Sequence, residues 1–304
     1  MIHDSLEHFL AALRAERRVF GRKRAPGAGR TAATSGPMAL IVVEDAAEIE
    51  TTLRHHLALG FARVAAFAPP DLPRPALSDP RLDWVRAETR TPSAGSDIVN
   101  TVIGAVPAGQ WLYYCYNAEY LYFPFSEDRG ITEFCAFLAE ERRDTASCVT
   151  VDLYVRDLTL HPDGLSRDEA HFDRLGYFAH GRRDAQGRSL DRQLDIFGGL
   201  RWRFEEHVPP ERRQIVRVAL FRAARGLTLG EDHRFDRAAY NELQCPWHRS
   251  PTAAICSFRA AKALRRNPAS RDVIASFDWA GATPFEWRAR QLLELGLMEP
   301  GQWF

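Results

Sequence analysis

The chain has 304 residues, of which 45% are hydrophobic and 26% are charged. These proportions are typical of a folded globular protein and argue against a disordered chain. The 40 basic and 40 acidic residues give a formal net charge of +0, so no overall field favours nucleic acid or a membrane as partner. No segment approaches the roughly 20 apolar residues that span a bilayer. We therefore expect a cytoplasmic protein that binds no nucleic acid and makes at most a peripheral membrane contact.

The first 37 residues differ in composition from the rest of the chain. Leu6, Phe9, Leu10 and Leu13 follow the spacing of an amphipathic helix. A basic run and a Gly/Pro/Ser-rich stretch come next, and the latter is typical of a linker. The basic residues are Arg14, Arg17, Arg18, Arg22, Lys23 and Arg24. We expect residues 1–37 to form a basic N-terminal appendage, which is either a patch for anionic lipid or polymer or a frayed helix and tether.

From residue 39 onward, strand and helix patterns alternate. Apolar runs predict strands at residues 39–43, 64–67, 82–85 and 111–116, and helical spacing predicts helices over 46–59, around 96–103 and over 131–138. Residues 148–154 alternate apolar and polar side chains, which predicts a half-buried strand. This alternation implies βαβ units and a largely parallel sheet.

A sheet of this kind binds ligands outside the carboxyl ends of its strands. The loops after Val43, Phe67 and Tyr116 are therefore the expected places for a site. None of them contains a Gly-rich dinucleotide fingerprint or a P-loop.

The second half of the chain has weaker patterns. Residues 155–195 are rich in Asp, Arg and His, and we expect a long surface excursion there. Residues 196–204 contain Gly198 and Gly199, which let the backbone pass close to a ligand or to another chain segment. Helices are expected near residues 252–266 and 285–295. We expect one domain over residues 38–304.

Cysteine usage favours reduced thiols. The five cysteines are widely spaced and form no CxxC pair, and they are Cys115, Cys135, Cys148, Cys245 and Cys256. Their odd number and spacing favour structural thiols over a disulfide framework or a metal site.

Several segments together resemble the bacterial family 2-type glycosyltransferases whose central motif reads Trp-Leu-x-x-x-Asp-x-Asp-Glu-Phe-Leu. Residues 111–121, WLYYCYNAEYL, fit this frame without a gap. The family's opening Lys-Asn-Glu and His-x-x-Leu-Gly elements correspond to residues 43–45, VED, and 56–60, HLALG. Its Gly-Gly-x-Arg and His-Phe-Lys elements correspond to residues 198–201, GGLR, and 257–259, SFR.

The resemblance implies a GT-A fold, which is a Rossmann-like, mostly parallel sheet flanked by helices, here with a mixed α-rich C-terminal part. The nucleotide-sugar half would be about residues 38–155 and the acceptor-side half about 156–304. The implied activity is transfer of a sugar from a nucleotide-sugar donor to a glycan or glycolipid acceptor, as in polysaccharide biosynthesis. The implied nucleotide-sugar-binding residues are Val43, Asp45, Asn117, Glu119, Arg201 and Arg259.

The chain departs from the family at the metal motif. In the family, two aspartates hold Mn²⁺ or Mg²⁺, which stabilises the leaving diphosphate. Here those positions are Tyr116 and Ala118, and the histidine of His-Phe-Lys is Ser257. Glu119 and His233 are the remaining candidates for metal ligands. Three explanations stay open: an inactive relative kept for binding or scaffolding, metal-free stabilisation by arginines such as Arg201, Arg203 or Arg259 with a helix N-terminus, or a site elsewhere in the chain.

The candidate residues each have a structural alternative. Asp45 either accepts hydrogen bonds from a base or ribose, or caps the following helix. Glu119 either contacts the donor or pairs with an arginine. Asp232 is the candidate base that deprotonates an acceptor hydroxyl, or part of an exposed acidic turn. His56 is interpreted as a packing residue at the edge of the core.

Overall fold

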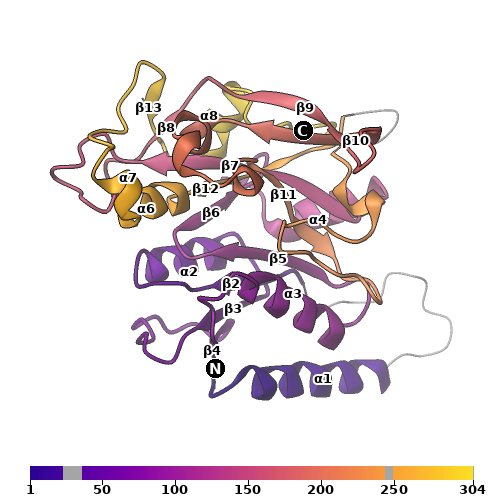
Figure 1. Ribbon diagram of the computed structural model, residues 1–304. Coiled ribbons are helices and arrows are strands. Elements are labelled where there is room, and N and C mark those ends of the chain that lie inside the picture. Colours follow the sequence, from indigo (N-terminus) through magenta and orange to yellow (C-terminus); the bar gives the residue numbers. More distant parts are fainter. Residues whose placement is uncertain (23–35, 244–248, 304) are drawn as a thin grey trace. The chain divides into compact units, whose positions relative to one another are not determined.

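The computed structural model describes residues 1–22, 36–243 and 249–303, with the side chains of residues 17–22 left undescribed. The chain divides into two compact units (Figure 1). Unit 1 comprises residues 1–117, 129–145 and 218–240, and unit 2 comprises residues 118–128, 146–217 and 241–304. Both units are mixed α/β structures with β-sheet and flanking helices.

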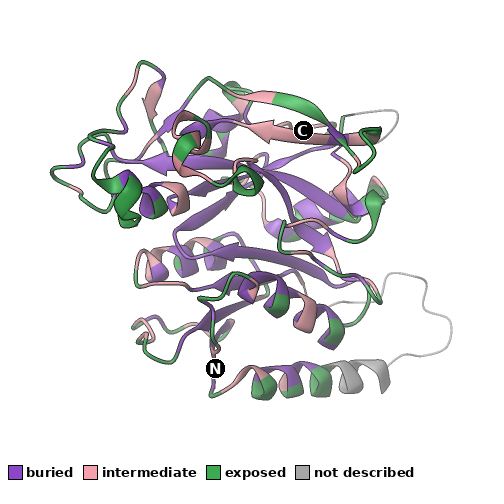
Figure 2. Cartoon of the chain, viewed as in Figure 1, coloured by how far each residue is buried: buried purple, intermediate pink, exposed green. Residues whose placement is uncertain are grey.

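Unit 1 is built on a mostly parallel sheet. Its strands are β1 (Ile2–His3), β2 (Met38–Val42), β3 (Arg63–Ala68), β4 (Leu82–Arg86), β5 (Trp111–Tyr116) and the end of β11 (Val216–Arg222). They lie in the order β1-β4-β3-β2-β5-β11, and only the β5–β11 pair is antiparallel. Figure 2 shows β2 and β5 buried along their length, as expected for strands covered on both faces. The four predicted strands of this part are confirmed.

Helices cover both faces of this sheet. They are α1 (Leu6–Arg22), α2 (Ile49–Ala58), α3 (Ala94–Ala105) and α4 (Ile131–Glu140). Alternate residues of β5 identify the faces. The ring of Tyr113 stacks on His56 of α2, with centroids 5.3 Å apart, whereas the hydroxyl of Tyr116 lies against Gly95 of α3. His56 is fully buried and its Nδ1 donates to the carbonyl oxygen of Thr52 at 2.8 Å, which confirms it as a packing residue.

The N-terminal segment differs from the expected appendage. β1 pairs in parallel with β4, and Phe9, Leu10 and Leu13 of α1 are buried in unit 1. The apolar stripe of the helix supplies the packing energy that a tether would lack. Arg14 is exposed. The other residues of the basic run, Arg17, Arg18, Arg22, Lys23 and Arg24, lie outside the residues whose side chains are described.

A buried ion pair fixes this segment to the sheet. Asp83 of β4 is 3% exposed and accepts hydrogen bonds from Arg63 Nε at 2.5 Å and His3 Nε2 at 2.9 Å. Burial raises the pKa of Asp83, but the hydrogen bond and charge of Arg63, followed by His3, hold it below the usual value overall. A carboxyl group with a lowered pKa stabilises the fold above its unfolded pKa, and this contribution is lost as the pH falls through the folded pKa.

We expect Asp83→Asn to lower the free energy of unfolding at pH 7 by about 2 kcal/mol, since it removes a charged hydrogen-bond acceptor from Arg63. The difference from the wild type should shrink below about pH 4, where the unfolded aspartate is itself protonated. Urea unfolding between pH 3 and 7 measures it. Asp4→Asn, at an exposed position nearby, is the matched control. A difference that stays constant over this range would contradict the assignment.

Unit 2 contains a mixed sheet. Its core is β7 (Thr145–Tyr154), β12 (Ala253–Ser257) and β6 (Glu119–Tyr122), with β12 parallel to β7 and antiparallel to β6. β8 (His171–Asp173) pairs antiparallel with β7, and β13 (Ala282–Pro284) pairs with β8. β7 is buried on both faces and not half-buried as predicted, because its polar face contacts residues 199–201 of the same unit.

The C-terminal part is not the α-rich region that we expected. Residues 178–197, most of which belong to the predicted surface excursion at 155–195, form an antiparallel ribbon of β9 (Phe178–Arg183) and β10 (Ser189–Phe197). The predicted helix over 252–266 is strand β12 followed by α6 (Arg259–Arg266). The other helices of this unit are short, namely α5 (Gly199–Arg203), α7 (Pro268–Arg271), α8 (Ala289–Glu294), η1 (Glu205–His207) and η2 (Pro210–Arg212), while η3 (Ala238–Asn241) spans the boundary between the units.

The described residues bear on two expectations, the absence of a membrane-spanning segment and the structural role of the cysteines. Within the described residues, no helix combines the length and apolarity needed to cross a membrane. Four cysteines are buried, namely Cys115, Cys135, Cys148 and Cys256. Burial raises the pKa of the Cys135 and Cys256 thiols well above the usual value, so these two are unreactive structural thiols. Cys245 lies outside the described residues.

Candidate functional site

At the carboxyl edge of the unit 1 sheet, Asn117 joins the ends of β2 and β5. Its side-chain oxygen accepts the backbone N–H of Glu44 at 2.9 Å, and its amide nitrogen donates to Asp45 Oδ1 at 2.7 Å and to the carbonyl oxygen of Ala47 at 2.8 Å. Asp45 Oδ1 also accepts the N–H of Ala47. Asn117 is fully buried. The structure therefore brings Asp45 and Asn117 together, with Asn117 bracing the loop from inside.

Asp45 does not cap α2 in the way that the sequence suggested. The residue at the N-cap position is Glu48, which has a left-handed backbone with φ 51°. Asp45 instead closes a turn two residues long, and its carboxylate is half-buried at the sheet edge. A carboxylate there is a hydrogen-bond acceptor suited to hydroxyl or N–H donors.

The loop after β4 also reaches this edge, and our sequence analysis did not include it. Thr89 is buried, and its hydroxyl donates to the carbonyl oxygen of Val43 at 2.5 Å. Arg90 donates to both carboxylate oxygens of Asp71, at 2.9 and 2.7 Å. This pair lowers the pKa of Asp71. The predicted strand at 82–85 could have pointed to this loop, because a fourth parallel strand ends at the same edge of the sheet.

The two candidates in the 230–234 turn of unit 1 have different environments. Asp232 is exposed, and its Oδ1 accepts the backbone N–H of Arg234 at 3.1 Å. This geometry is that of the exposed acidic turn. His233 contacts Tyr114, whose hydroxyl lies 3.1 Å from His233 Nδ1 and whose ring stacks on the imidazole.

In unit 2, Glu119 is fully buried and both of its carboxylate oxygens have protein partners. Oε2 accepts Arg217 Nη2 at 2.5 Å, and Oε1 accepts the hydroxyl of Ser257 at 3.0 Å. Ser257 lies opposite Glu119 in the β12–β6 pair and beside Asp152 in the β12–β7 pair. Glu119 therefore forms the arginine pair that we gave as one of its two interpretations.

Arg201 binds the next carboxylate in this row. Its Nε lies 3.2 Å from Asp152 Oδ1, and its backbone N–H donates to Oδ2 at 3.3 Å. Gly199, with φ 64°, is required at this approach, since a Cβ would lie 3.0 Å from Asp152 Oδ2. Burial raises the pKa of Asp152, and the charge of Arg201 offsets this only in part. The two glycines thus let the backbone pass another chain segment.

These residues do not fit a metal site. Glu119 is bound by a guanidinium and a hydroxyl, and Ser257, at the family's histidine position, donates to it. Among the residues that the structure describes, no group of three His, Cys, Asp or Glu side chains is placed to hold a metal ion. Arg259 is half-buried at the first position of α6, and its backbone N–H donates to the Ser257 hydroxyl at 3.2 Å.

Comparison with known proteins adds no family. No protein-family model matches the chain, and no curated protein has significant sequence similarity to it.

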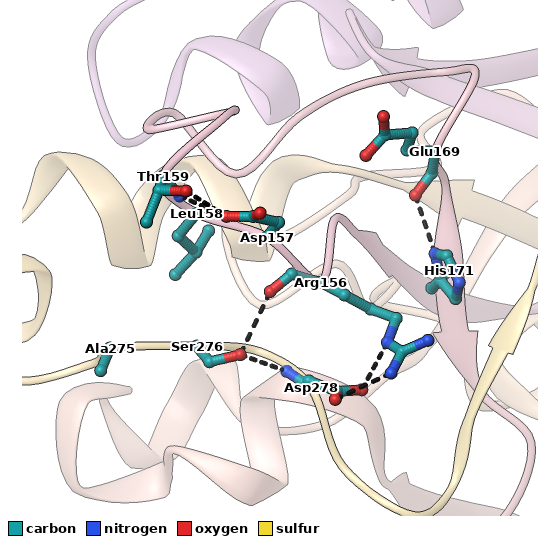
Figure 3. Close-up of a pocket in the computed structure, with 9 residues that line it drawn as sticks. All are labelled: Arg156, Asp157, Leu158, Thr159, Glu169, His171, Ala275, Ser276 and Asp278. Atoms are coloured by element: carbon teal, nitrogen blue, oxygen red, sulfur yellow. Dashed lines mark hydrogen bonds and ion pairs between the residues drawn. The ribbon is translucent and has the colours of Figure 1, made fainter.

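An open groove of about 580 Å³ also lies in unit 2. Figure 3 shows Asp157 and Thr159 on one side, Glu169 and His171 on another, and the Arg156–Asp278 pair between them. Arg156 donates to both oxygens of Asp278, at 2.6 and 2.9 Å. None of the candidate site residues from the sequence lines this groove. It is formed by the segment after β7, the start of β8 and the 275–278 loop, which the sequence did not relate to one another.

Proposed function

We propose that this chain is a glycosyltransferase-like protein that transfers a sugar from a nucleotide-sugar to a glycan or lipid acceptor without a divalent metal at residues 116–119. The observation that carries the proposal is the pairing of Glu119 with Arg217 and Ser257. The carboxylate retained from the family motif already has a fixed cation as partner. The family resemblance of residues 111–121 supplies the reaction class.

The leaving diphosphate would then require a cation from the protein. Arg259 is the predicted arginine at the start of a helix, where backbone N–H groups and the helix dipole favour an anion. We therefore assign the diphosphate to Arg259 and the N-terminus of α6 in this proposal.

Thermal unfolding with a panel of nucleotides and nucleotide-sugars tests the proposal. A ligand at 100 times its Kd should stabilise the protein by about 2.7 kcal/mol. The same stabilisation is expected with Mn²⁺ and with EDTA. Arg259→Ala should weaken binding about ten-fold or more, because it removes a charge-assisted contact to the diphosphate.

Arg266→Ala, at the other end of the same helix and exposed, is the matched control. It should leave the nucleotide-dependent stabilisation unchanged. Stabilisation that appears only with Mn²⁺ would contradict the metal-free mechanism. No stabilisation by any nucleotide or nucleotide-sugar would contradict the glycosyltransferase proposal as a whole.

A non-catalytic binding or scaffold protein of the same fold is the second candidate. It is favoured because Glu119, Arg201 and Arg203 each form an ion pair with another residue of unit 2. Release of nucleoside diphosphate separates the two candidates. An enzyme releases it from a nucleotide-sugar with or without acceptor, whereas a binding protein is stabilised by the nucleotide-sugar and releases none.

A further inference from the structure

The charge of the unit 2 groove restricts what it can bind. Asp157, Glu169 and Asp278 contribute three carboxylates and Arg156 one guanidinium, so the groove has two excess negative charges when His171 is neutral. A diphosphate would be repelled by this field. The groove is therefore unsuited to the nucleotide part of a donor.

The lining also offers polar groups that can bind a hydroxyl group. Carboxylates accept hydrogen bonds and the guanidinium of Arg156 donates them. The hydroxyls of Thr159 and Ser276 donate to Asp157 Oδ1 and to the carbonyl oxygen of Arg156, respectively, and their oxygens can accept. The Nδ1 of His171 lies 2.8 Å from the carbonyl oxygen of Glu169 and must donate to it, which leaves Nε2 as the acceptor of the neutral ring. Such a mixture of donors and acceptors matches a ligand rich in hydroxyl groups.

One carboxylate oxygen of Asp173 connects the three chain segments that line the groove. Asp173 Oδ1 accepts hydrogen bonds from the Tyr154 hydroxyl at 2.5 Å, Trp279 Nε1 at 2.6 Å and Arg203 Nη1 at 3.2 Å. Tyr154, Asp173 and Trp279 each stand one or two residues from a groove residue, namely Arg156, His171 and Asp278. The three chain segments that form the groove are thus held together before any ligand binds.

We propose that this groove binds a neutral saccharide, as the acceptor-sugar site of the transfer proposed above. The volume of about 580 Å³ lies within the range of small-molecule sites. Sugar hydroxyls would donate to Asp157 and Glu169 and accept from Arg156. The inference rests on the proposed function for the role of the sugar as acceptor, but the binding itself does not need nucleotide.

Saturation-transfer NMR with lactose and maltose tests the binding, with glucosamine as the cationic probe and UDP as the anionic one. We expect signals from the neutral disaccharides. Ala275→Trp, at an exposed position that lines the groove, should abolish them. Glu169→Gln should weaken binding about ten-fold by removing one charge-assisted hydrogen bond. Ala185→Trp, in the exposed turn between β9 and β10, is the control and should change nothing.

Each outcome bears on the inference. Absence of signal from both neutral disaccharides, signals that persist in Ala275→Trp, or binding of glucosamine alone would overturn it. UDP signals that disappear in Ala275→Trp would overturn it as well, since they would place the nucleotide in the groove. If saccharides bind as expected while no nucleotide-sugar stabilises the protein, the groove stands and the transferase proposal fails. If a nucleotide-sugar stabilises the protein while neither disaccharide binds, the saccharide site is wrong and the transferase proposal remains.

Discussion

Replacing Arg217 with methionine is expected to lower the free energy of unfolding by about 3–5 kcal/mol. The substitution removes the guanidinium of Arg217 from the fully buried carboxylate of Glu119. The Ser257 hydroxyl, which also donates to this carboxylate, cannot compensate a full charge. Methionine retains much of the arginine stem, so packing changes little. Urea unfolding at pH 7 measures the loss.

A double variant separates this effect from a simple loss of packing. Glu119→Gln combined with Arg217→Met removes both charges, and replacement of a whole buried pair is far less costly than removal of one member. We expect the double variant to be more stable than Arg217→Met alone. Arg212→Met, at an exposed position, should change stability by less than about 0.5 kcal/mol. If the double variant were less stable than the single one, the ion pair would not be the cause.

The same pair illustrates what could not be predicted from the sequence. Glu119 and Arg217 are 98 positions apart, and no local pattern connects them. The interpretation of Glu119 as one half of an arginine pair followed from its residue type, but the identity of the arginine did not. Asp152 was expected on the open face of a half-buried strand, and it is buried because Gly199 and Arg201 cover that face.

The parallel strands of unit 1 were predictable for a physical reason. β2 and β5 are buried on both faces. Their sequences are therefore continuous apolar runs, which are easily distinguished from polar loops. The β9–β10 ribbon has few buried residues, and its Arg- and Asp-rich sequence carries no apolar period. β12 was mistaken for a helix because Ala253 and Ala254 favour helix locally, whereas the neighbouring strands β6 and β7 determine the outcome.

Residues 116–119 show which features of a site a sequence motif can predict and which it cannot. The apolar run at residues 111–116 predicted strand β5 correctly, since β5 ends at Tyr116. The motif alone could not show that the carboxylate at position 119 binds Arg217 and Ser257. The side chains that lie at the sheet edge with Asp45, namely Thr89 and Arg90, come from a loop that the motif does not include.

The second large effect is expected at Asp173. Asp173→Ala should lower the free energy of unfolding by about 3–5 kcal/mol, because it removes the buried carboxylate that binds the half-buried guanidinium of Arg203. Tyr154 and Trp279 lose their acceptor at the same time. Thermal and urea unfolding measure the loss, with the exposed Asp168→Ala as control.

A milder variant relates this carboxylate to the groove. Asp173→Asn keeps an oxygen that can accept from Tyr154 and Trp279 but removes the charge that holds Arg203. It should therefore be more stable than Asp173→Ala and less stable than the wild type. Because Asp173 is the common acceptor under all three groove segments, saccharide signals should weaken in both variants even where the protein remains folded. A folded Asp173→Ala protein with unchanged saccharide binding would show that the groove does not depend on this carboxylate for its shape.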